Sequence, residues 1–187
     1  MLALSNISQI YKQGNESIKV LDNLSLKLDN FCNVGLIGPS GSGKSTLLNL
    51  IGLLENPTSG RIKINNLDCE GFNLEEKTNF RRNNIGFIFQ NNQLLEDFTC
   101  EENVALPLIL NGISYKKSIL KAQELLVDLG LDTRMKIKPS LLSGGEQQRV
   151  AVLRALIKRP LIILADEPTG SLDDLNAKNV FKQIINL

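Results

Sequence analysis

The chain has 187 residues, 42% of them hydrophobic, which is enough to bury the core of one domain of ordinary size. Its 21 basic and 20 acidic residues nearly cancel and form no long run of one sign, so the charge pattern gives no support for nucleic-acid binding. No apolar run approaches the length of a membrane span, and residues 1–6 lack the pattern of a signal peptide. The three cysteines are widely spaced, so we expect neither a zinc site nor a disulfide framework.

Short strands are predicted in the first third of the chain. Residues 3–11 read as one strand, and residues 24–28 alternate between apolar and polar side chains as a second. Residues 61–64 alternate in the same way and end at Asn65-Asn66, a pair typical of turns. We therefore expect the N-terminal part of the chain to be rich in β-structure.

A glycine-rich run between a predicted strand and a predicted helix is the most specific motif. The run Gly38-Pro39-Ser40-Gly41-Ser42-Gly43-Lys44-Ser45-Thr46 fits G-x-x-x-x-G-K-[ST], with an apolar strand expected over 34–37 and a helix over 46–51. In this setting backbone N–H groups and the positive end of the helix point at phosphates. Lys44 is expected to reach the β- and γ-phosphates, and the Ser45 hydroxyl to ligate Mg²⁺. A plain Gly/Ser turn is the alternative, and the matched context disfavours it.

The middle of the chain turns from strand to helix. Residues 85–89 form a nearly continuous apolar run, as expected for a buried parallel strand. Thr99 and Glu102 have the spacing of a capping box, and a longer helix is predicted over 115–129, ending at Gly130. The stretch from about residue 91 to about 142 is therefore predicted to be a helical insert in an α/β core.

Two further motifs carry chemistry downstream. Residues 161–165 predict a buried strand that ends in Asp166 and Glu167, where ligand sites of α/β sheets lie. Asp166 is placed to hold Mg²⁺, and Glu167 to orient and deprotonate an attacking water. The run Leu142-Ser143-Gly144-Gly145-Glu146-Gln147-Gln148-Arg149 starts with an S-x-x-E capping box, and its two glycines leave N–H groups open to an anion. An amphipathic helix is predicted over 177–185.

Together these motifs resemble the nucleotide-binding domain of ATP-binding-cassette (ABC) proteins. The Walker A run is residues 38–45, the signature is residues 142–147, and the Walker B strand ends at residues 166–167. Further matches are Gln90 for the Q-loop, Ser171-Leu172-Asp173 for the D-loop, Tyr11 for the aromatic residue that stacks on adenine, and Val20 for a second apolar contact. The resemblance covers essentially the whole chain. It implies an α/β fold of the P-loop NTPase type, with a mostly parallel central sheet, an N-terminal antiparallel β subdomain and a helical signature subdomain.

The resemblance also implies one nucleotide-binding domain over residues 1–187, with a catalytic core of about 1–90 and 143–187 and a helical insert of about 91–142. The implied cofactors are ATP and Mg²⁺, and the implied partners are a second copy of the chain in a head-to-tail dimer and integral membrane permease subunits, with no nucleic acid. In that dimer ATP lies between the Walker A run of one copy and the signature of the other.

The residues expected to carry the chemistry follow from these motifs. The expected catalytic residues are Glu167, Lys44 and Gln90, and the expected metal ligands are Ser45, Gln90 and Asp166. The residues expected to bind the nucleotide are Tyr11, Val20, Gly38, Pro39, Ser40, Gly41, Ser42, Gly43, Lys44, Ser45 and Thr46, and in trans Ser143, Gly144 and Gly145.

The segment after the Q-loop indicates which branch of the family the chain resembles. Residues 89–99 and 102–108 resemble the ATP-binding subunits of lipoprotein-releasing systems at the cytoplasmic face of the bacterial inner membrane, although macrolide-export and cell-division relatives share parts of the pattern. Leu94, Leu95 and Phe98 either pack the helical insert or help to form an apolar groove that receives membrane partners. We expect a charged residue at Leu95 or Phe98 to prevent membrane association while sparing ATP binding.

The sequence departs from the family pattern at one point. Family members carry a switch histidine on a strand that follows the D-loop helix, whereas these 187 residues contain no histidine. We therefore expect a C-terminally shortened form, poorly stable and weak or inactive as an ATPase on its own. The alternatives are a nucleotide-binding module without turnover and a soluble cassette ATPase that acts on ribosomes or DNA.

Overall fold

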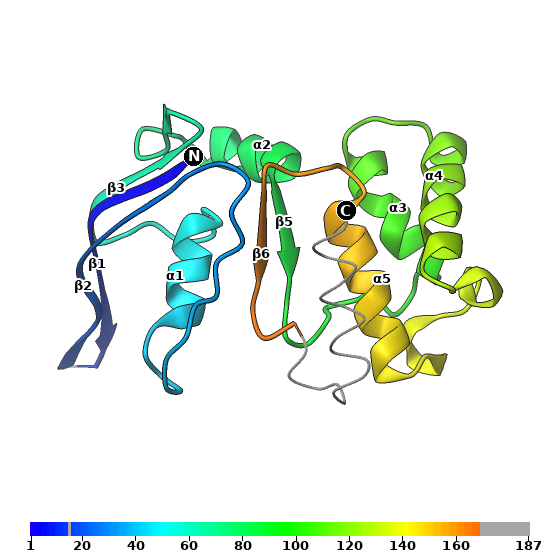
Figure 1. The fold of residues 1–187 in the computed structure, drawn as a ribbon, viewed down its shortest axis with the longest axis horizontal. Coiled ribbons are helices and arrows are strands. Elements are labelled where there is room, and N and C mark those ends of the chain that lie inside the picture. Colours follow the sequence, from blue (N-terminus) through cyan, green and yellow to red (C-terminus); the bar gives the residue numbers. More distant parts are fainter. Residues whose placement is uncertain (15, 169–187) are drawn as a thin grey trace. The chain divides into compact units, whose positions relative to one another are not determined.

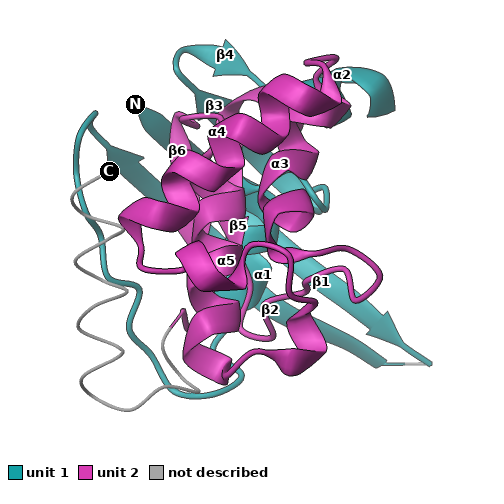
Figure 2. Cartoon of the chain, turned by 90° about the vertical axis from the view of Figure 1, so that its right-hand side faces the viewer, with its two compact units in different colours: residues 1–81 teal, residues 82–187 magenta. Residues whose placement is uncertain are grey.

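The computed structural model describes residues 1–14 and 16–168, and the chain divides into two compact units, residues 1–81 and 82–187 (Figures 1 and 2). Each unit is described by itself. The predicted helix over 177–185 and the D-loop residues 171–173 lie outside the described residues. The predicted division into a core and a helical insert of one domain stays a prediction.

Unit 1 contains an antiparallel sheet, as the family resemblance implied. Its strands are β1 (Leu2–Gln13), β2 (Glu16–Leu28), β3 (Ser59–Ile64) and β4 (Leu67–Asp68), in the order β2-β1-β3-β4. Leu2, Leu4, Ile62 and Ile64 are buried, and the pairing sets Leu4 opposite Ile62 and Leu2 opposite Ile64. The strands predicted over 3–11, 24–28 and 61–64 are thus confirmed, because period-two alternation places one face in the core.

Two helices complete unit 1. Helix α1 (Lys44–Ile51) follows the glycine run (Figure 1). It buries Leu47, Leu50 and Ile51, which share one helical face. Helix α2 (Leu74–Asn84), which extends past the boundary of unit 1, was not predicted. Its eleven residues bury only Phe80 among their side chains, so the sequence carries no amphipathic pattern to indicate it.

The strand predicted over residues 34–37 is wrong. These residues form no strand, and the side chains of Val34, Leu36 and Ile37 are 58%, 45% and 96% exposed. A strand needs a neighbour to pair with its N–H and C=O groups, and among the described residues no ladder includes this segment. Apolar composition alone does not supply that pairing.

Unit 2 contains a parallel strand pair, β5 (Ile85–Ile88) and β6 (Ile162–Ala165), with Ile85 opposite Ile162 and Ile88 opposite Ala165. Helix α5 (Gly144–Leu156) packs on this pair through Val152, Ala155 and Leu156. Gly86 allows the helix to approach closely, because a Cβ there would lie 2.6 Å from the backbone oxygen of Ala155. Both predicted strands are confirmed, but β6 is mostly half-buried, with only Leu164 buried and Leu161 exposed just before it.

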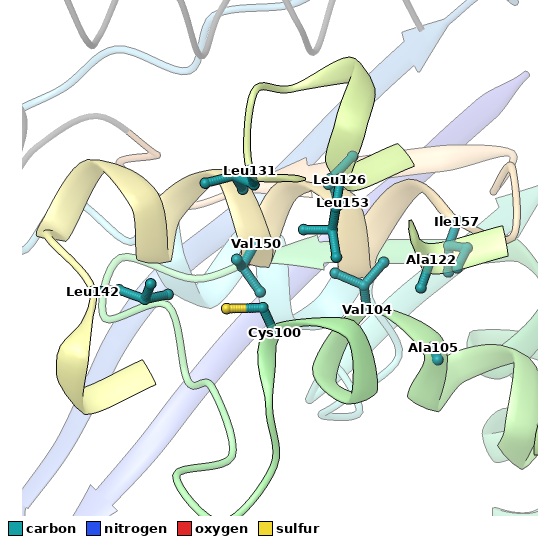
Figure 3. Close-up of a cluster of buried hydrophobic side chains, with 10 residues drawn as sticks. All are labelled: Cys100, Val104, Ala105, Ala122, Leu126, Leu131, Leu142, Val150, Leu153 and Ile157. Atoms are coloured by element: carbon teal, nitrogen blue, oxygen red, sulfur yellow. The ribbon is translucent and has the colours of Figure 1, made fainter. Parts of the chain in front are cut away.

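The other helices that the structure describes in unit 2 are α3 (Cys100–Leu110), α4 (Tyr115–Asp128) and two short 3₁₀ turns, η1 (Asp132–Arg134) and η2 (Pro139–Leu141). Figure 3 shows the core that α3, α4 and α5 share, which comprises Cys100, Val104, Ala105, Ala122, Leu126, Leu131, Leu142, Val150, Leu153 and Ile157. Residues 91–142 are thus built from helices, as predicted. Within the described residues, no helix combines the length and the apolar character that crossing a bilayer requires.

Candidate nucleotide-binding site

The glycine run forms a loop that leads directly into α1. Gly41 and Gly43 have φ values of 77° and 89°, which favour glycine over other residues. A Cβ on Gly43 would lie 2.9 Å from Val20 Cγ1, so glycine is needed there for space as well. This contact also places Val20 beside the loop, while its predicted contact with the base stays a prediction.

The N-terminus of α1 is open. Gly43 is its N-cap, and no side chain caps the helix, so the first backbone N–H groups have no side-chain partner there. The Lys44 ammonium donates hydrogen bonds to the carbonyl oxygens of Gly38, at 2.9 Å, and Pro39, at 2.8 Å. The lysine therefore lies against the same loop whose N–H groups and helix dipole favour an anion. Residues 38–46 thus form one element of unit 1 whose backbone and charge suit an anion.

Tyr11 is tied to this element through its hydroxyl. The phenol donates a hydrogen bond of 2.5 Å to Glu55 Oε2, and the Thr46 side chain lies near enough to the phenol to act on its pKa. Burial, with the Glu55 hydrogen bond second, raises the pKa of Tyr11. Tyr11 is 36% exposed. The site residues predicted for this unit, Tyr11, Val20 and the run from Gly38 to Thr46, are thus brought together.

In unit 2, Gln90 and Glu167 lie side by side. The Gln90 amide donates a 2.7 Å hydrogen bond to Glu167 Oε2, and the Asp166 N–H donates to the Ile88 carbonyl at 2.9 Å. This contact follows from the sheet topology, because β5 and β6 are parallel neighbours and their carboxyl ends lie at the same edge of the sheet. Glu167 has a φ of 45°, a backbone conformation that a glutamate adopts only when its surroundings hold it.

The segment after Gln90 is held by the signature helix. Asn92 and Gln93 have positive φ values of 46° and 47°, and the Arg154 guanidinium donates 2.6 Å hydrogen bonds to both of their carbonyl oxygens. Burial lowers the pKa of Arg154. The sequence pattern contained no signal for this link, because it joins residues about sixty positions apart.

The signature begins α5 with the predicted capping box. The Ser143 hydroxyl donates to Glu146 Oε2 at 2.9 Å, and the Ser143 N–H donates to the same oxygen at 2.8 Å. Arg134 donates to the other oxygen, Glu146 Oε1, at 2.8 Å. The Arg134 hydrogen bond, followed by the Ser143 N–H, lowers the pKa of Glu146 to about 2. The partners of Ser143 are thus Glu146 and its own helix, not Gln90 or Glu167.

The predicted apolar groove residues differ in burial. Leu94 packs against the helical core, whereas Leu95 and Phe98 are 41% and 39% exposed. Their backbone is fixed by Asn103, a fully buried side chain whose amide nitrogen donates to the carbonyls of both and whose oxygen accepts from the Leu95 N–H. Packing in the helical core therefore accounts for the apolar side chain of Leu94, whereas Leu95 and Phe98 are exposed and accessible to a partner.

The metal-ligand prediction spans both units. Ser45 lies in unit 1, whereas Gln90 and Asp166 lie in unit 2, so their joint coordination stays a prediction. Among the described residues, no group of three or more His, Cys, Asp or Glu side chains forms a ready metal site. The hydroxyl, amide and carboxylate oxygens of the predicted set nevertheless fit Mg²⁺, which takes few protein ligands and completes its shell with water and phosphate oxygens.

Comparison with known proteins gives three findings. The model of the family described as ABC transporter matches residues 21–170. The ATP-binding protein LolD 1 of a lipoprotein-releasing system from Rhodospirillum rubrum is 43% identical over 186 residues, covering 100% of this chain and 82% of that protein. The LolD protein of Rickettsia bellii is 47% identical, again over 100% and 82% of the two chains.

Solved structures agree with this relationship. The ATP-binding cassette MJ0796, described as a dimer in a post-hydrolysis state bound to ADP and Pi, superposes with a TM-score of 0.91 at 41% identity. The superposition covers 99% of this chain and 83% of that one. The motifs, the fold of the two units and these similarities lead to one conclusion: the chain belongs to the ABC transporter family, and it is an ATP-binding subunit homologous to LolD.

Proposed function

We propose that this chain binds and hydrolyses ATP at the cytoplasmic face of the inner membrane and thereby drives the release of lipoproteins toward the outer membrane. The observation that carries this proposal is the identity of 43% and 47%, over the whole chain, with two proteins named for lipoprotein release. The contact between Gln90 and Glu167 supports the hydrolytic part. A related macrolide-type exporter or cell-division complex is the alternative.

In this proposal, the residues of unit 1 hold the nucleotide. The N–H groups of residues 38–46 and the Lys44 ammonium bind the phosphates, while Tyr11 and Val20 contact the base. Mg²⁺, when bound to Ser45, Gln90 and Asp166, supplies charge neutralisation between the phosphates. Catalysis of phosphoryl transfer to water depends on such positioning and neutralisation more than on covalent chemistry.

Glu167 and Gln90 act on the attacking water. The Glu167 carboxylate accepts the proton of the water, and the Gln90 amide, which bonds to this carboxylate at 2.7 Å, fixes its direction. Water held by such a pair is oriented in line with the leaving group, which lowers the entropic cost of attack. The weak turnover expected for this chain alone stays a prediction, which a phosphate-release assay of the purified chain tests.

A second copy completes the proposed site. The helix N-terminus at Ser143, Gly144 and Gly145 is exposed or half-buried, so it is accessible to the ATP held by a partner. The dimeric description of MJ0796 supports this arrangement. The carboxylate of Glu146 lies at the same helix end, and its pairing with Arg134 offsets a charge that would otherwise repel phosphate.

Permease subunits are the proposed membrane partners, and the exposed pair Leu95 and Phe98 is their proposed contact. The variant Phe98→Glu places a charge in this apolar surface, so it should abolish co-purification with the membrane subunits while leaving ATP affinity within about twofold of wild type. A separate assay tests cargo release. The complex of the wild-type chain with the membrane subunits is reconstituted in vesicles that carry a lipoprotein, and release of the lipoprotein is measured.

The matched control is Leu120→Glu, because Leu120 is also exposed, at 53%, but lies on α4. Full recovery of the membrane complex with Phe98→Glu would contradict the contact. A complex that assembles and hydrolyses ATP but releases no lipoprotein would favour an exporter of another cargo.

A further inference from the structure

The phosphate-binding helix and the tyrosine expected at the base are joined by one carboxylate. Glu55 accepts a hydrogen bond from the Tyr11 hydroxyl on Oε2, at 2.5 Å, and from the Asn49 side-chain amide on Oε1, at 2.9 Å. Asn49 belongs to α1, which also begins with Lys44 and Ser45. All these residues lie in unit 1, so the connection is internal to one compact body.

Glu55 is held in place by a tight turn at the end of α1. The Gly52 N–H donates to Leu48 O at 2.8 Å, and the Leu54 N–H donates to Asn49 O at 2.9 Å, a pattern that reverses the chain over the last helical turn. Leu53 has a φ of 55° in this turn. The left-handed backbone conformation is unfavourable for leucine by itself, so the surroundings of Leu53 must hold it there.

Two contacts fix this turn. Leu53 is 4% exposed, and its carbonyl accepts a 2.7 Å hydrogen bond from Arg81. The backbone is therefore anchored at Leu53, two residues before Glu55, and the carboxylate is presented to Tyr11 from a rigid element. A side chain on a mobile loop would hold the phenol less well.

The Tyr11 ring needs such an anchor. The residue is 36% exposed, so packing alone does not enclose it. Tyr11 lies near the end of β1, two residues before the strand ends at Gln13. Because an aromatic platform contributes to binding only when its plane is fixed before the ligand arrives, the hydroxyl contacts decide how useful the ring is.

We propose that Glu55 is a positioning residue for nucleotide binding, which orients the Tyr11 ring from the helix that carries the phosphate-binding residues. This inference rests on the proposed role of Tyr11 at the base. It makes base recognition and phosphate recognition parts of one hydrogen-bonded unit, Asn49–Glu55–Tyr11, rather than two separate contacts. Glu55 itself contacts no nucleotide.

The test compares a ligand with a base and a ligand without one. We expect Glu55→Gln to weaken binding of Mg-ATP about threefold to tenfold in calorimetric titration, the range that one well-placed hydrogen bond contributes. Binding of Mg-tripolyphosphate, which has no base, should stay unchanged. Tyr11→Phe keeps the ring and removes the hydroxyl, so it should weaken ATP binding to the same extent.

The double variant separates positioning from two independent contacts. Tyr11→Phe combined with Glu55→Gln should bind ATP no more weakly than either single variant, because both changes break the same link. The matched control is Glu70→Gln, which removes an exposed carboxylate that pairs with Arg61 in the same unit. It should leave both affinities unchanged.

The chain offers a spectroscopic readout as well. It has two tyrosines and no tryptophan, so in a Tyr115→Phe background the tyrosine fluorescence comes from Tyr11 alone. ATP should quench this fluorescence, and Glu55→Gln should change the signal of the free protein and shift the quenching to higher ATP concentrations.

Two different failures can be told apart. Unchanged ATP affinity of both Glu55→Gln and Tyr11→Phe, with normal binding by the wild type, would overturn the positioning role alone. Absence of ATP binding by the wild-type chain, at concentrations where tripolyphosphate also fails to bind, would instead overturn the proposed function.

Discussion

At the scale of single residues, one carboxylate links the signature to the helical region before it. Glu146 accepts hydrogen bonds from Ser143 on one oxygen and from Arg134 on the other. Ser143 opens α5, whereas Arg134 ends the 3₁₀ turn η1. These bonds hold the start of the signature helix against the preceding loop, and the ion pair with Arg134 requires an ionised Glu146.

This ionisation predicts how stability depends on pH. The pKa of Glu146 is lowered from an ordinary 4.5 to about 2, chiefly by the Arg134 hydrogen bond. A lowered pKa means that the native state holds the proton more weakly than the unfolded chain does. The contribution of Glu146 is therefore complete above pH 4.5 and is lost as the pH falls toward 2.

The measurement is denaturant unfolding at a series of pH values. We expect the free energy of unfolding to fall less steeply between pH 4.5 and 2 in Glu146→Gln than in the wild type. Arg134→Gln should also flatten the curve, because it removes the largest cause of the shift. Identical slopes in all three proteins would contradict the role given to this ion pair.

At the scale of elements, close helix–sheet packing positions the residues that follow β5 and β6. The backbone of α5 approaches β5 at Gly86, where any side chain would meet Ala155. Gln90 follows β5, and Glu167 follows β6, so their contact depends on the register of this pair. A change in helix–sheet spacing is therefore expected to disturb the candidate catalytic pair.

The variant Gly86→Ala tests this packing. Its Cβ would lie 2.6 Å from a backbone oxygen, which cannot move aside as a flexible side chain can. We expect unfolding to become easier by about 1–3 kcal/mol, the usual cost of overpacking a core. Gly71→Ala is the control, since a Cβ there meets nothing within 4 Å. Equal stability of the two variants would show that α5 can retreat without cost.

The elements also show where sequence reasoning succeeds. Both capping boxes, at Thr99 and Ser143, are present as predicted, because each depends on residues only three positions apart. The alternating strand at residues 61–64 is present for the same kind of local reason. The apolar run at 34–37 was misread, because a strand depends on a neighbour that composition does not reveal.

The site shows the same limit. The family resemblance assigned Gln90 and Glu167 to one site, and the structure joins them by a hydrogen bond, while their catalytic roles stay a prediction. Glu55, Asn103 and Arg154 were not predicted to act, because their partners are brought close by turns and packing rather than by sequence distance. Motifs thus indicate the residues of the predicted site, whereas the residues that hold those in place are identified only from the structure.

At the scale of the whole molecule, the proposed site is shared between two copies of the chain. The loop at 38–46 with its lysine is one half, and the exposed N-terminus of α5, which Ser143 caps, is the other. An exposed helix terminus favours an anion by only about 0.3–1 kcal/mol, and exclusion of water on closure strengthens the contact. Association of two copies should therefore depend on bound ATP.

The most direct test is the mass of the protein in solution with and without Mg-ATP, measured by light scattering on Glu167→Gln, which keeps ATP intact. We predict that Glu167→Gln is a monomer without nucleotide and a dimer with Mg-ATP. Adding Gly145→Asp puts a negative charge at the signature helix, so this protein should stay a monomer with Mg-ATP although it still binds ATP. A Glu167→Gln protein that binds ATP fully yet stays monomeric would contradict a site shared between two copies.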